Sequence, residues 1–466
     1  MNGKHNLVIV GAGPAGLAAA VKARGLGLDV VVLDEQPAPG GQVWRALEAQ
    51  AARNEAWLPR DARAGTLIAD FRSCGADYRP NRKVWQIEPG FTVFASADGK
   101  ADRIETQAVL LATGAQERPV PFPGWTLPGV MTVGAAQILL KSSGQIPDEP
   151  VFIAGSGPLL LLYANQLLAA GGRIAGVLDT TPPSNRLPAM AALPEALRNA
   201  SEIMRGVGWI RRLKQAKVPV VKGVSQLEAQ GREAVETIRY RTGAGEERTA
   251  PARLLLIHEG VVPSIHMSLA LGCRHSWSDR QLCFVPQLDE YGQSSVPGLF
   301  IAGDGTAIGG VAAACLKGEL AAIGVAVRLG HLSAEAAEGD ASALRRKLSR
   351  ALATRRMLDM LYRPRGEVLT PSDDTIICRC EEITARQVRA AARVGIAGVN
   401  QVKTFTRCGM GPCQGRECGY TVSALVAEAT GKPMDEIGFY RIRPPLKPVT
   451  LGELASIESD DIAMMA

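Results

Sequence analysis

The sequence predicts an α/β fold with two dinucleotide-binding domains, the second inserted in the first, followed by a small α-rich domain. Two glycine-rich turns, each lying between an apolar strand and a helix, predict the two α/β domains. Five of the nine cysteines of this 466-residue chain fall in its last fifth, and their clustering predicts the third domain. The expected parts are the first domain in two pieces (1–145 and 266–330), the inserted domain (146–265), a helical linker (331–371), the cysteine domain (372–432) and a C-terminal tail (433–466).

The composition is that of an ordinary globular protein, with 46% apolar and 21% charged residues. The net charge of +6 is small for this length and the basic residues are scattered, so we expect no nucleic-acid partner. No run of about 18 apolar residues is free of helix breakers, so we expect no transmembrane segment. The chain leads straight into a strand, which leaves no room for a signal peptide. Four cysteines are isolated in the sequence, namely Cys74, Cys273, Cys283 and Cys315. Together these features favour a reducing cytoplasm.

The N-terminal unit has the strand–turn–helix–strand order that a dinucleotide site requires. An apolar strand at 7–10 leads into Gly11-Ala-Gly13-Pro-Ala-Gly16, an Ala-rich helix and a second apolar strand that ends in Asp34. Gly11 permits the tight turn, Gly13 lets the backbone approach a pyrophosphate, and Gly16 lets the helix pack close to the strand. The helix N-terminus offers free N–H groups to phosphates, and Asp34, 18 residues past Gly16, is placed to accept hydrogen bonds from an adenosine ribose.

Three further motifs indicate which dinucleotide is bound. The strand AVLLATG ends at Gly114, the strand LFIAGD ends at Asp304 ahead of a helix, and GGQ spans residues 40–42. An acid at the end of such a strand can bind a ribityl hydroxyl, and the positive end of the following helix favours an anionic reduced flavin. These residues resemble the flavoprotein superfamily of glutathione and thioredoxin reductases. The resemblance implies FAD, bound by Gly11, Gly13, Gly16, Asp34, Glu35, Gly41, Gln42, Thr113, Gly114, Gly303 and Asp304.

The second glycine-rich unit departs from the pattern at one position. A strand at 151–154 precedes Gly155-Ser-Gly157-Pro-Leu-Leu160, an apolar helix and a strand that ends in Asp179. Leu160 stands where the third glycine is expected, and its side chain would push the helix away from the strand or force repacking. We therefore expect the fold to persist. Two alternatives stay open for the site, NAD(P)H binding and a retained structural domain, and Leu160 favours the second.

Two observations narrow the chemistry. His258 stands at the end of the returning strand RLLLIHEG and is expected to be structural, or a contact near the flavin, rather than catalytic. Disulfide reductases act through a CxxxxC or CxxC pair, but residues 40–60 hold no cysteine, and Cys273 and Cys283 are ten positions apart. Disulfide reduction is therefore not expected.

The C-terminal cysteines read CRC and then RCGMGPCQGREC. A domain of about 55 residues has a small apolar core and needs an additional source of stability, which a metal centre supplies. Zinc prefers CxxC knuckles, whereas CxC followed by a 32-residue gap between Cys380 and Cys413 resembles the [2Fe–2S] domain of bacterioferritin-associated ferredoxins. That resemblance implies Cys378, Cys380, Cys413 and Cys418 as cluster ligands and Cys408 as the spare. A competing set uses Cys408 and Cys413 and leaves Cys418 over, because both pairs are spaced CxxxxC.

The order of these motifs, together with the tail RIRPPLKPVTLGELA, resembles the α subunit of opine (octopine/nopaline) oxidases over nearly the full length. Related families are the D-hydroxyproline and dye-linked proline dehydrogenases and the cyanide synthase and sarcosine oxidase α subunits. The resemblance implies an electron-transfer subunit with FAD and a [2Fe–2S] cluster. A D-amino-acid-oxidase-like flavoprotein β subunit would oxidise an opine or proline-type secondary amine. It further implies FMN at the α–β junction, a small third subunit, and a quinone or dye as acceptor.

Two other functions stay open at the level of sequence. One is a stand-alone NAD(P)H-dependent reductase that passes electrons through FAD to the cluster, against which Leu160 argues. The other is a structural subunit whose first site holds only an adenine nucleotide. No nucleophile–base pair or carboxylate dyad is evident, which fits a chain that orients cofactors and has no catalytic side chain of its own.

Overall fold

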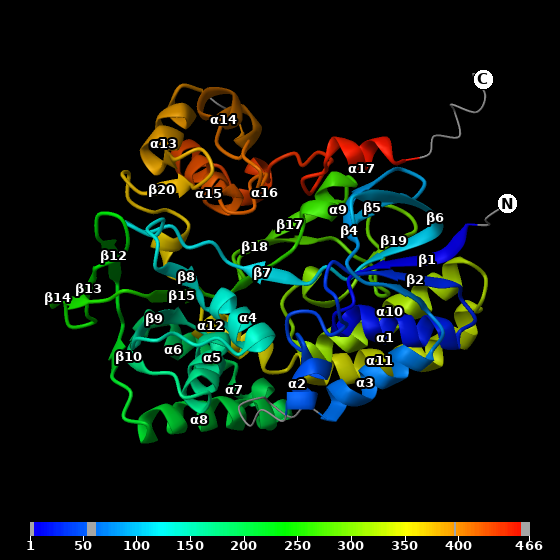
Figure 1. The fold of residues 1–466 in the computed structure, drawn as a ribbon, viewed down its shortest axis with the longest axis horizontal. Coiled ribbons are helices and arrows are strands. Elements are labelled where there is room, and N and C mark those ends of the chain that lie inside the picture. The colour runs from blue at the N-terminus through cyan, green and yellow to red at the C-terminus, as the bar shows by residue number, and fades with distance from the viewer. Residues whose placement is uncertain (1–3, 54–61, 396–397, 458–466) are drawn as a thin grey trace.

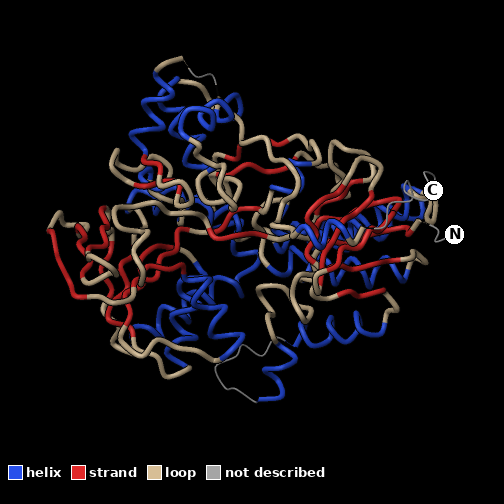
Figure 2. Tube along the Cα trace, turned by 45° about the horizontal axis from the view of Figure 1, so that its top comes forward, coloured by secondary structure: helices blue, strands red, loops and turns tan. Residues whose placement is uncertain are grey.

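The computed structural model describes residues 4–53, 62–395 and 398–457. Two α/β domains lie side by side, and the small cysteine domain, coloured orange, sits above them in the view of Figure 1. Figure 2 shows that each large domain has its own sheet with helices packed against it. Among the described residues, no helix is both long and apolar enough to cross a membrane.

The first domain is built on a seven-stranded sheet. Its spatial order is β3 (Asp77–Arg79), β2 (Val30–Leu33), β1 (His5–Val10), β6 (Lys100–Leu111), β5 (Thr92–Ala97) and β4 (Lys83–Ile87), with β19 (Leu299–Ile301) also paired to β6. β1, β2, β3, β19 and the second half of β6 run parallel, whereas β4 and β5 are antiparallel. Val30–Leu33 is buried on both faces, which explains its unbroken apolar sequence.

Helices cover one face of the parallel part of this sheet, and the antiparallel strands β4 and β5 cover the other. The helices are α1 (Pro14–Gly25), α2 (Leu47–Arg53), α3 (Ala62–Ser73) and α10 (Val311–Arg328). α1 and α10 pack closely because their contact faces are mostly alanine and glycine: a Cβ on Gly318 would lie 2.1 Å from Ala15 O. On the opposite face, the apolar side chains of β4 and β5 pack against β1 and β2.

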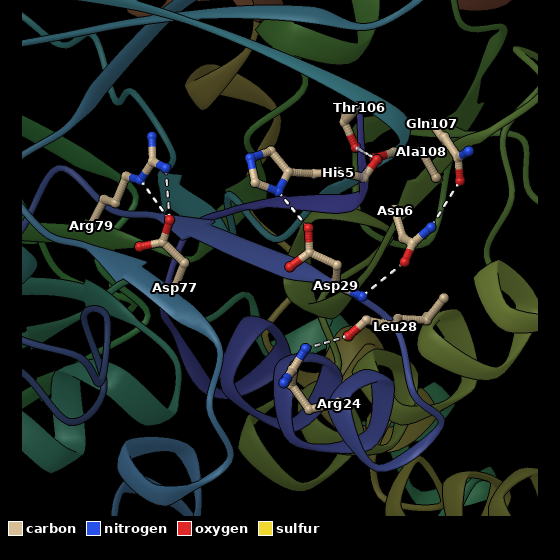
Figure 3. Close-up of polar contacts among 10 residues, drawn as sticks. All are labelled: His5, Asn6, Arg24, Leu28, Asp29, Asp77, Arg79, Thr106, Gln107 and Ala108. Carbon is tan, nitrogen blue, oxygen red and sulfur yellow. Dashed lines mark hydrogen bonds and ion pairs between the residues drawn. The ribbon is translucent and has the colours of Figure 1, made fainter. Parts of the chain in front are cut away.

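Side-chain bonds fix the register of β1 at the end of the sheet away from the glycine turn (Figure 3). Asn6 joins both neighbouring strands, donating to Gln107 Oε1 at 2.9 Å and accepting from the backbone N of Asp29 at 2.9 Å. His5 Nδ1 lies 2.6 Å from Asp29 Oδ2, and Thr106 Oγ1 donates to His5 O at 3.1 Å. The opposite end of β1 is thereby held in register beside β2 and β6, where the nucleotide motifs follow.

The inserted domain has a five-stranded parallel sheet. Its order is β11 (Val220–Lys222), β10 (Ile174–Asp179), β9 (Val151–Ser156), β15 (Leu255–Glu259) and β8 (Val130–Thr132). Its helices are α4 (Val133–Ser143), α5 (Pro158–Ala169), α6 (Arg186–Ala191), α7 (Leu193–Ala196) and α8 (Ala200–Gln215). An antiparallel sheet, β12 (Gln226–Gln230), β13 (Thr237–Arg241) and β14 (Glu247–Pro251), is attached to it. β8 and α4 precede the predicted boundary at residue 146, yet β8 pairs with β15 in this sheet.

Short elements connect the two large domains. They are β7 (Ala115–Glu117) paired with β16 (Val261–Pro263), α9 (His266–Ala270), and the hairpin of β17 (His275–Ser278) and β18 (Cys283–Pro286). β7 follows the ATG motif directly and β16 follows β15, so this two-stranded ribbon carries the chain into and out of the inserted domain.

The linker differs from prediction. The basic pattern from Ser342 to Tyr362 predicts one helix, but the structure has two, α11 (Ala334–Ala351) and α12 (Arg355–Leu361). α11 begins earlier because the Ser333 hydroxyl caps it, accepting from Ala336 N at 3.2 Å. The chain turns at Ala353 and Thr354, which are buried, because α11 packs on α10 of the first domain and α12 on α6 of the second.

The cysteine domain is mostly helical, as predicted. It comprises β20 (Ile376–Cys378), β21 (Ile383–Thr384), α13 (Ala385–Arg393), α14 (Val399–Thr406), α15 (Gly419–Thr430) and α16 (Met434–Ile437). Thr384, followed three residues later by Gln387, has the sequence of a capping box, and that box is present at the start of α13. Its apolar core also includes Tyr440, Ile442 and Leu446, so the segment after 432 completes this domain.

The C-terminal segment then crosses the first domain and ends in α17 (Leu451–Ala455), drawn red in Figure 1. Leu446 N donates to Trp85 O at 2.7 Å, and Lys447 Nζ pairs with Glu35 Oε2 at 2.8 Å. These contacts fix the cysteine domain to the domain that carries the first glycine turn.

Candidate functional site

The first glycine turn has the close packing predicted for it. Gly11 has a φ of +107°, and a Cβ there would lie 2.6 Å from Ala112 O. A Cβ on Gly16 would lie 1.9 Å from Gly11 O, so only glycine lets α1 sit this close to the turn. No side chain caps α1, and Pro14 occupies its first turn. The remaining first-turn N–H groups are therefore directed toward a phosphate position.

The two acids after β2 have different partners. Asp34 is buried, and its carboxylate accepts from the backbone N of Ala12 and, at 2.7 Å, from that of Gln36. Burial raises its pKa, while these two hydrogen bonds act in the opposite direction. Each carboxylate oxygen keeps a second lone pair, so Asp34 can brace the turn and still accept from a ribose. Glu35 is exposed instead and pairs with Lys447 of the C-terminal segment.

The GGQ segment lies at the junction of the first turn and the inserted domain. Gly41 touches Gly13 so closely that a Cβ on Gly41 would come within 2.9 Å of Gly13 Cα. The Gln42 side chain is exposed and accepts from Arg45 Nε at 3.2 Å. Lys141 of α4 donates to the Gln42 carbonyl at 3.1 Å, and burial lowers its pKa to about 8. The backbone of this segment, rather than the Gln42 side chain, meets the glycine turn.

The ATG and GD motifs converge on the same turn. A Cβ on Gly303 would be 2.9 Å from the Ala15 side chain, and one on Gly305 would be 3.5 Å from Gly114 O. Gly114 O also accepts from Ser264 N at 3.0 Å. Thr113 Oγ1 donates to Ser264 O at 3.4 Å. The predicted residues of both motifs therefore lie beside the glycine turn, and the site that they share with it is called the first crevice.

Asp304 and Lys317 fix the loop that begins at the GD motif. Asp304 Oδ1 accepts from Gly309 N at 2.8 Å and Gly310 N at 3.0 Å, just before α10. Lys317 Nζ donates to Thr306 Oγ1 at 2.6 Å, and burial lowers its pKa to about 8. Lys317 was not predicted from the sequence; a charged residue inside the apolar run VAAACLKGELAAIG was the available signal.

The second glycine turn is looser, as Leu160 led us to expect. The Leu160 side chain is buried in the apolar core between α5 and the sheet. The first helical bond of α5, from Leu161 N to Gly157 O, measures 3.5 Å, whereas the equivalent bond of α1, from Leu17 N to Gly13 O, measures 2.9 Å. A side chain at the third position is thus accommodated by a wider turn.

Charged side chains fill the edge of the sheet beside this second turn. Glu259, the last residue of β15, is 1% exposed; its Oε1 accepts from Thr180 Oγ1 at 2.8 Å and pairs with Arg365 Nε at 3.3 Å. One residue earlier, His258 is buried with Nδ1 2.7 Å from Glu117 Oε1, in agreement with a structural role. No partner of Glu259 was predicted, because Arg365 lies 106 positions away.

The five clustered cysteines come from two segments of the cysteine domain, the end of β20 and the loop between α14 and α15. The sulfurs of Cys378, Cys408 and Cys418 lie within 4.8 Å of one another, and all three residues are buried. The side chains of Cys380 and Cys413 are hydrogen-bonded to each other, and Cys380 also feels the charge of Cys378. The structure thus groups the predicted ligands Cys378 and Cys418 with Cys408, the predicted spare, and pairs Cys380 with Cys413.

The donors suit a thiolate-bound centre. Hydrogen bonds from Cys408 and Cys418 lower the pKa of Cys378 to about 2, which favours the thiolate that metals require. The same hydrogen bonds, together with burial, raise the pKa of Cys418 well above its usual range, because Cys378 holds the negative charge and Cys418 keeps its proton. Tyr440 packs in the same buried cluster as these cysteines, and its hydroxyl donates to Cys408 O at 3.2 Å. Gly411 is needed for space, since a Cβ there would lie 2.2 Å from the Cys380 Cβ.

The cysteine loop lies directly against the ribbon that leaves the ATG motif. Gln116 Nε2, two residues after Gly114, donates at 3.2 Å to the carbonyl of Arg416, which lies between Cys413 and Cys418. Nearby in the chain, Arg118 is fully buried and donates to the carbonyls of Glu259, Gln281 and Leu282. Neither side chain was predicted from the sequence, because neither belongs to a motif.

Comparison with known families agrees with this architecture. The model of the pyridine nucleotide-disulphide oxidoreductase family matches residues 5–330, and that of the sarcosine oxidase A3 domain matches residues 373–457. The chain is thus an oxidoreductase with a flavoprotein-type core. It is 42% identical to the A subunit of opine oxidase from Rhizobium meliloti, over 99% of this chain and 89% of that protein. The chain belongs to the family of opine oxidase A subunits.

More distant relatives also match nearly the whole of this chain. Hydrogen cyanide synthase subunit HcnB of Pseudomonas protegens is 34% identical over 95% of this chain and 96% of its own length. The sarcosine oxidase α subunit of Rhizobium meliloti is 25% identical, with 96% of this chain matching 42% of that longer protein. The crystal structure of L-proline dehydrogenase from P. horikoshii superposes with a TM-score of 0.71 at 21% identity, covering 97% of this chain and 79% of that one. The predicted family and fold class are confirmed.

Proposed function

We propose that this chain is the electron-transfer subunit of a heteromeric flavin and iron–sulfur oxidoreductase, and that a partner subunit oxidises the amine. The contact of Gln116 with the Arg416 carbonyl supports the proposal most directly. It joins the ribbon next to the first nucleotide crevice to the loop that carries the cysteines. Two redox groups held at these positions would be neighbours within one chain.

FAD is the proposed occupant of the first crevice. The amides of Gly13 and of the first turn of α1 would bind the pyrophosphate, and Asp34 the adenosine ribose. The Gly303–Asp304 loop would meet the ribityl chain, with Thr113 and Gly114 beside the ring system. Gly11, Gly16 and Gly41 act by leaving space. Glu35 and Gln42 contribute through their backbone, because their side chains bond Lys447 and Arg45.

A [2Fe–2S] cluster is the proposed occupant of the cysteine loop, with Cys378, Cys380, Cys413 and Cys418 as ligands. Cys408 Sγ would then serve as a neighbouring donor, which agrees with its lying beside Cys378 and Cys418. When bound, FAD accepts an electron pair and the cluster transfers electrons singly. The chain's own part is to hold the two groups close together and to keep the cysteine loop packed under Tyr440.

The substrate reaction is assigned to another subunit. The relatives named above are subunits of opine oxidase, hydrogen cyanide synthase and sarcosine oxidase, and this chain offers no nucleophile–base pair among the described residues of its first crevice. A D-amino-acid-oxidase-like β subunit would oxidise an opine or proline-type amine, with FMN at the junction of the subunits. Electrons would leave to a quinone or dye, and a small third subunit would complete the complex.

The test is to purify the native complex and the single chain, and to identify bound cofactors by mass and absorbance. The complex should oxidise the amine with a dye as acceptor, and the single chain should not. Turnover of an opine or proline by the single chain would overturn the assignment to the partner. A single chain that releases no yellow flavin on denaturation would instead favour a structural subunit holding an adenine nucleotide.

The ligand set has its own test. Cys418→Ser should abolish the visible absorption of the cluster and lower the iron content of the purified protein, whereas Cys408→Ser should preserve both. The reverse outcome would assign Cys408 as the ligand in place of Cys418. Both variants are buried cysteine-to-serine changes in the same cluster, so each serves as the packing control for the other.

A further inference from the structure

The second dinucleotide-type crevice is the site beside the glycine turn at 155–160. In a parallel sheet of this kind the nucleotide binds outside the carboxyl ends of the strands, next to the glycine turn. In the inserted domain this edge is formed by β9, β10 and β15. Glu259 ends β15 and pairs in register with Ser156 of the glycine turn. Its carboxylate, 1% exposed, therefore lies where a pyrophosphate would have to approach.

A buried carboxylate at this position disfavours a dinucleotide on electrostatic grounds. Two negative groups in a site of low dielectric repel strongly, and the phosphates would have to displace the bonds that Glu259 already makes. Those bonds come from Thr180 Oγ1 at 2.8 Å and Ser156 Oγ at 3.4 Å, both from the strands that border the crevice.

The positive charge that compensates Glu259 comes from the linker. Arg365 Nε lies 3.3 Å from Glu259 Oε1, and the Arg365 side chain is only 9% exposed. The same guanidinium donates through Nη1 to Ser225 O at 2.6 Å, on the far side of the crevice. Arg365 thus spans the opening from β15 to the segment that follows β11.

The linker is fixed on both sides of Arg365. Before it, Asn185 Nδ2 donates to the carbonyls of Leu361 and Arg363, at 3.2 and 2.9 Å. After it, Val368 is 1% exposed and packs in the apolar core of the inserted domain, together with residues of β10 and β15. In Figure 1, α12 lies among the helices of this domain, as these contacts require.

We propose that linker residues 362–368 are the permanent occupant of the second crevice, with Arg365 holding the place of a nucleotide by neutralising Glu259. The domain then acts as a rigid support and binds no NAD(P)H. The inference rests on the proposed function and deepens it, because it removes nicotinamide as an electron source and leaves that role to the partner. Leu160 acts in the same direction from the other side of the glycine turn.

The test uses the full chain with its native cofactors. Arg365→Met should lower the thermal midpoint by about 5 °C, because it leaves Glu259 buried without its cation. Glu259→Gln combined with Arg365→Met should recover most of that loss, since no charge is then left uncompensated. Arg363→Met, on the exposed side of the same segment, is the matched control and should leave the midpoint unchanged.

Hydrogen exchange supplies the readout that is specific to occupancy. Arg365→Met should speed amide exchange at 362–368 and in the glycine turn at 155–160, with the turn at 11–16 unaffected. Wild-type protein in 1 mM NADH or NADPH should show no protection at 155–160.

Protection at 155–160, or faster exchange of the linker on adding nucleotide, would overturn the proposal. An Arg365→Met protein with the same thermal midpoint and amide exchange as Arg363→Met would also overturn it. Protection at 11–16 alone would leave the proposal intact and would count against FAD in the first crevice. Flavin and iron contents of the same samples report separately on the proposed function.

Discussion

Replacing Gly16 by alanine tests whether the first crevice depends on contact between α1 and the glycine turn. The added Cβ would lie 1.9 Å from Gly11 O, whereas ordinary contacts begin at 3.4 Å. Helix or turn must therefore move by about 1.5 Å, an overpacking change that costs roughly 1–3 kcal/mol or more of folding free energy. The same movement misaligns the first-turn amides. Losing one charge-assisted hydrogen bond of about 1.5–3 kcal/mol weakens FAD binding about tenfold to a hundredfold.

The assay is flavin affinity by fluorescence on protein stripped of its flavin, together with a urea unfolding curve. Gly25→Ala is the matched control: it lies in the same helix, is exposed, and has nothing within 4 Å of its Cβ. Alanine there should be neutral or stabilise by up to about 1 kcal/mol. The steric reasoning fails if the Gly16→Ala protein keeps both its flavin affinity and its unfolding midpoint.

Three further predictions concern buried polar groups. Because burial lowers the pKa of Lys317 to about 8, the folded state holds fewer protons than the unfolded state above that pH. The free energy of unfolding of the wild type, relative to that of Lys317→Met, should therefore rise between pH 8 and pH 10. A difference in urea midpoint between the two proteins that is the same at both pH values would contradict this. Tyr440→Phe leaves the Cys408 carbonyl without this hydrogen bond and should lower the free energy of unfolding in urea by about 1–3 kcal/mol, with the iron content unchanged. Loss of iron would mean that Tyr440 also supports the cluster. Trp125→Phe removes the 2.6 Å bond to Ile376 O, so amide exchange in β20 should quicken while β1 stays protected, and unaltered exchange would show that the bond is dispensable.

Much of the fold could be predicted because its signals are local. The glycine turns, the apolar strands of the two parallel sheets and the capping box at Thr384 each depend on residues within one or two turns of chain. The linker shows the limit. Its basic pattern continues through residue 354, but the helix breaks there because α11 and α12 pack on different domains. Tertiary contacts, rather than local propensity, place that break.

The sites divide in the same way. The spacing of the cysteines predicted Cys378, Cys380, Cys413 and Cys418 as one ligand set, and the structure groups two of these, Cys378 and Cys418, with Cys408. The spacing alone left Cys408 and Cys418 as alternatives, because their positions depend on how the loop folds under Tyr440.

What the sequence by itself determined is the set of short-range patterns: two glycine turns, one of them altered by Leu160, and a cysteine group suited to a metal centre. Only the tertiary structure decided which side chains lie beside each turn. In the first, Gly16 and Gly41 leave space beside the turn, and Asp34 braces it. In the second, Glu259 is neutralised by Arg365 from 106 positions further along the chain. A buried charge requires a partner, but nothing in its neighbouring residues indicates where in the chain that partner lies.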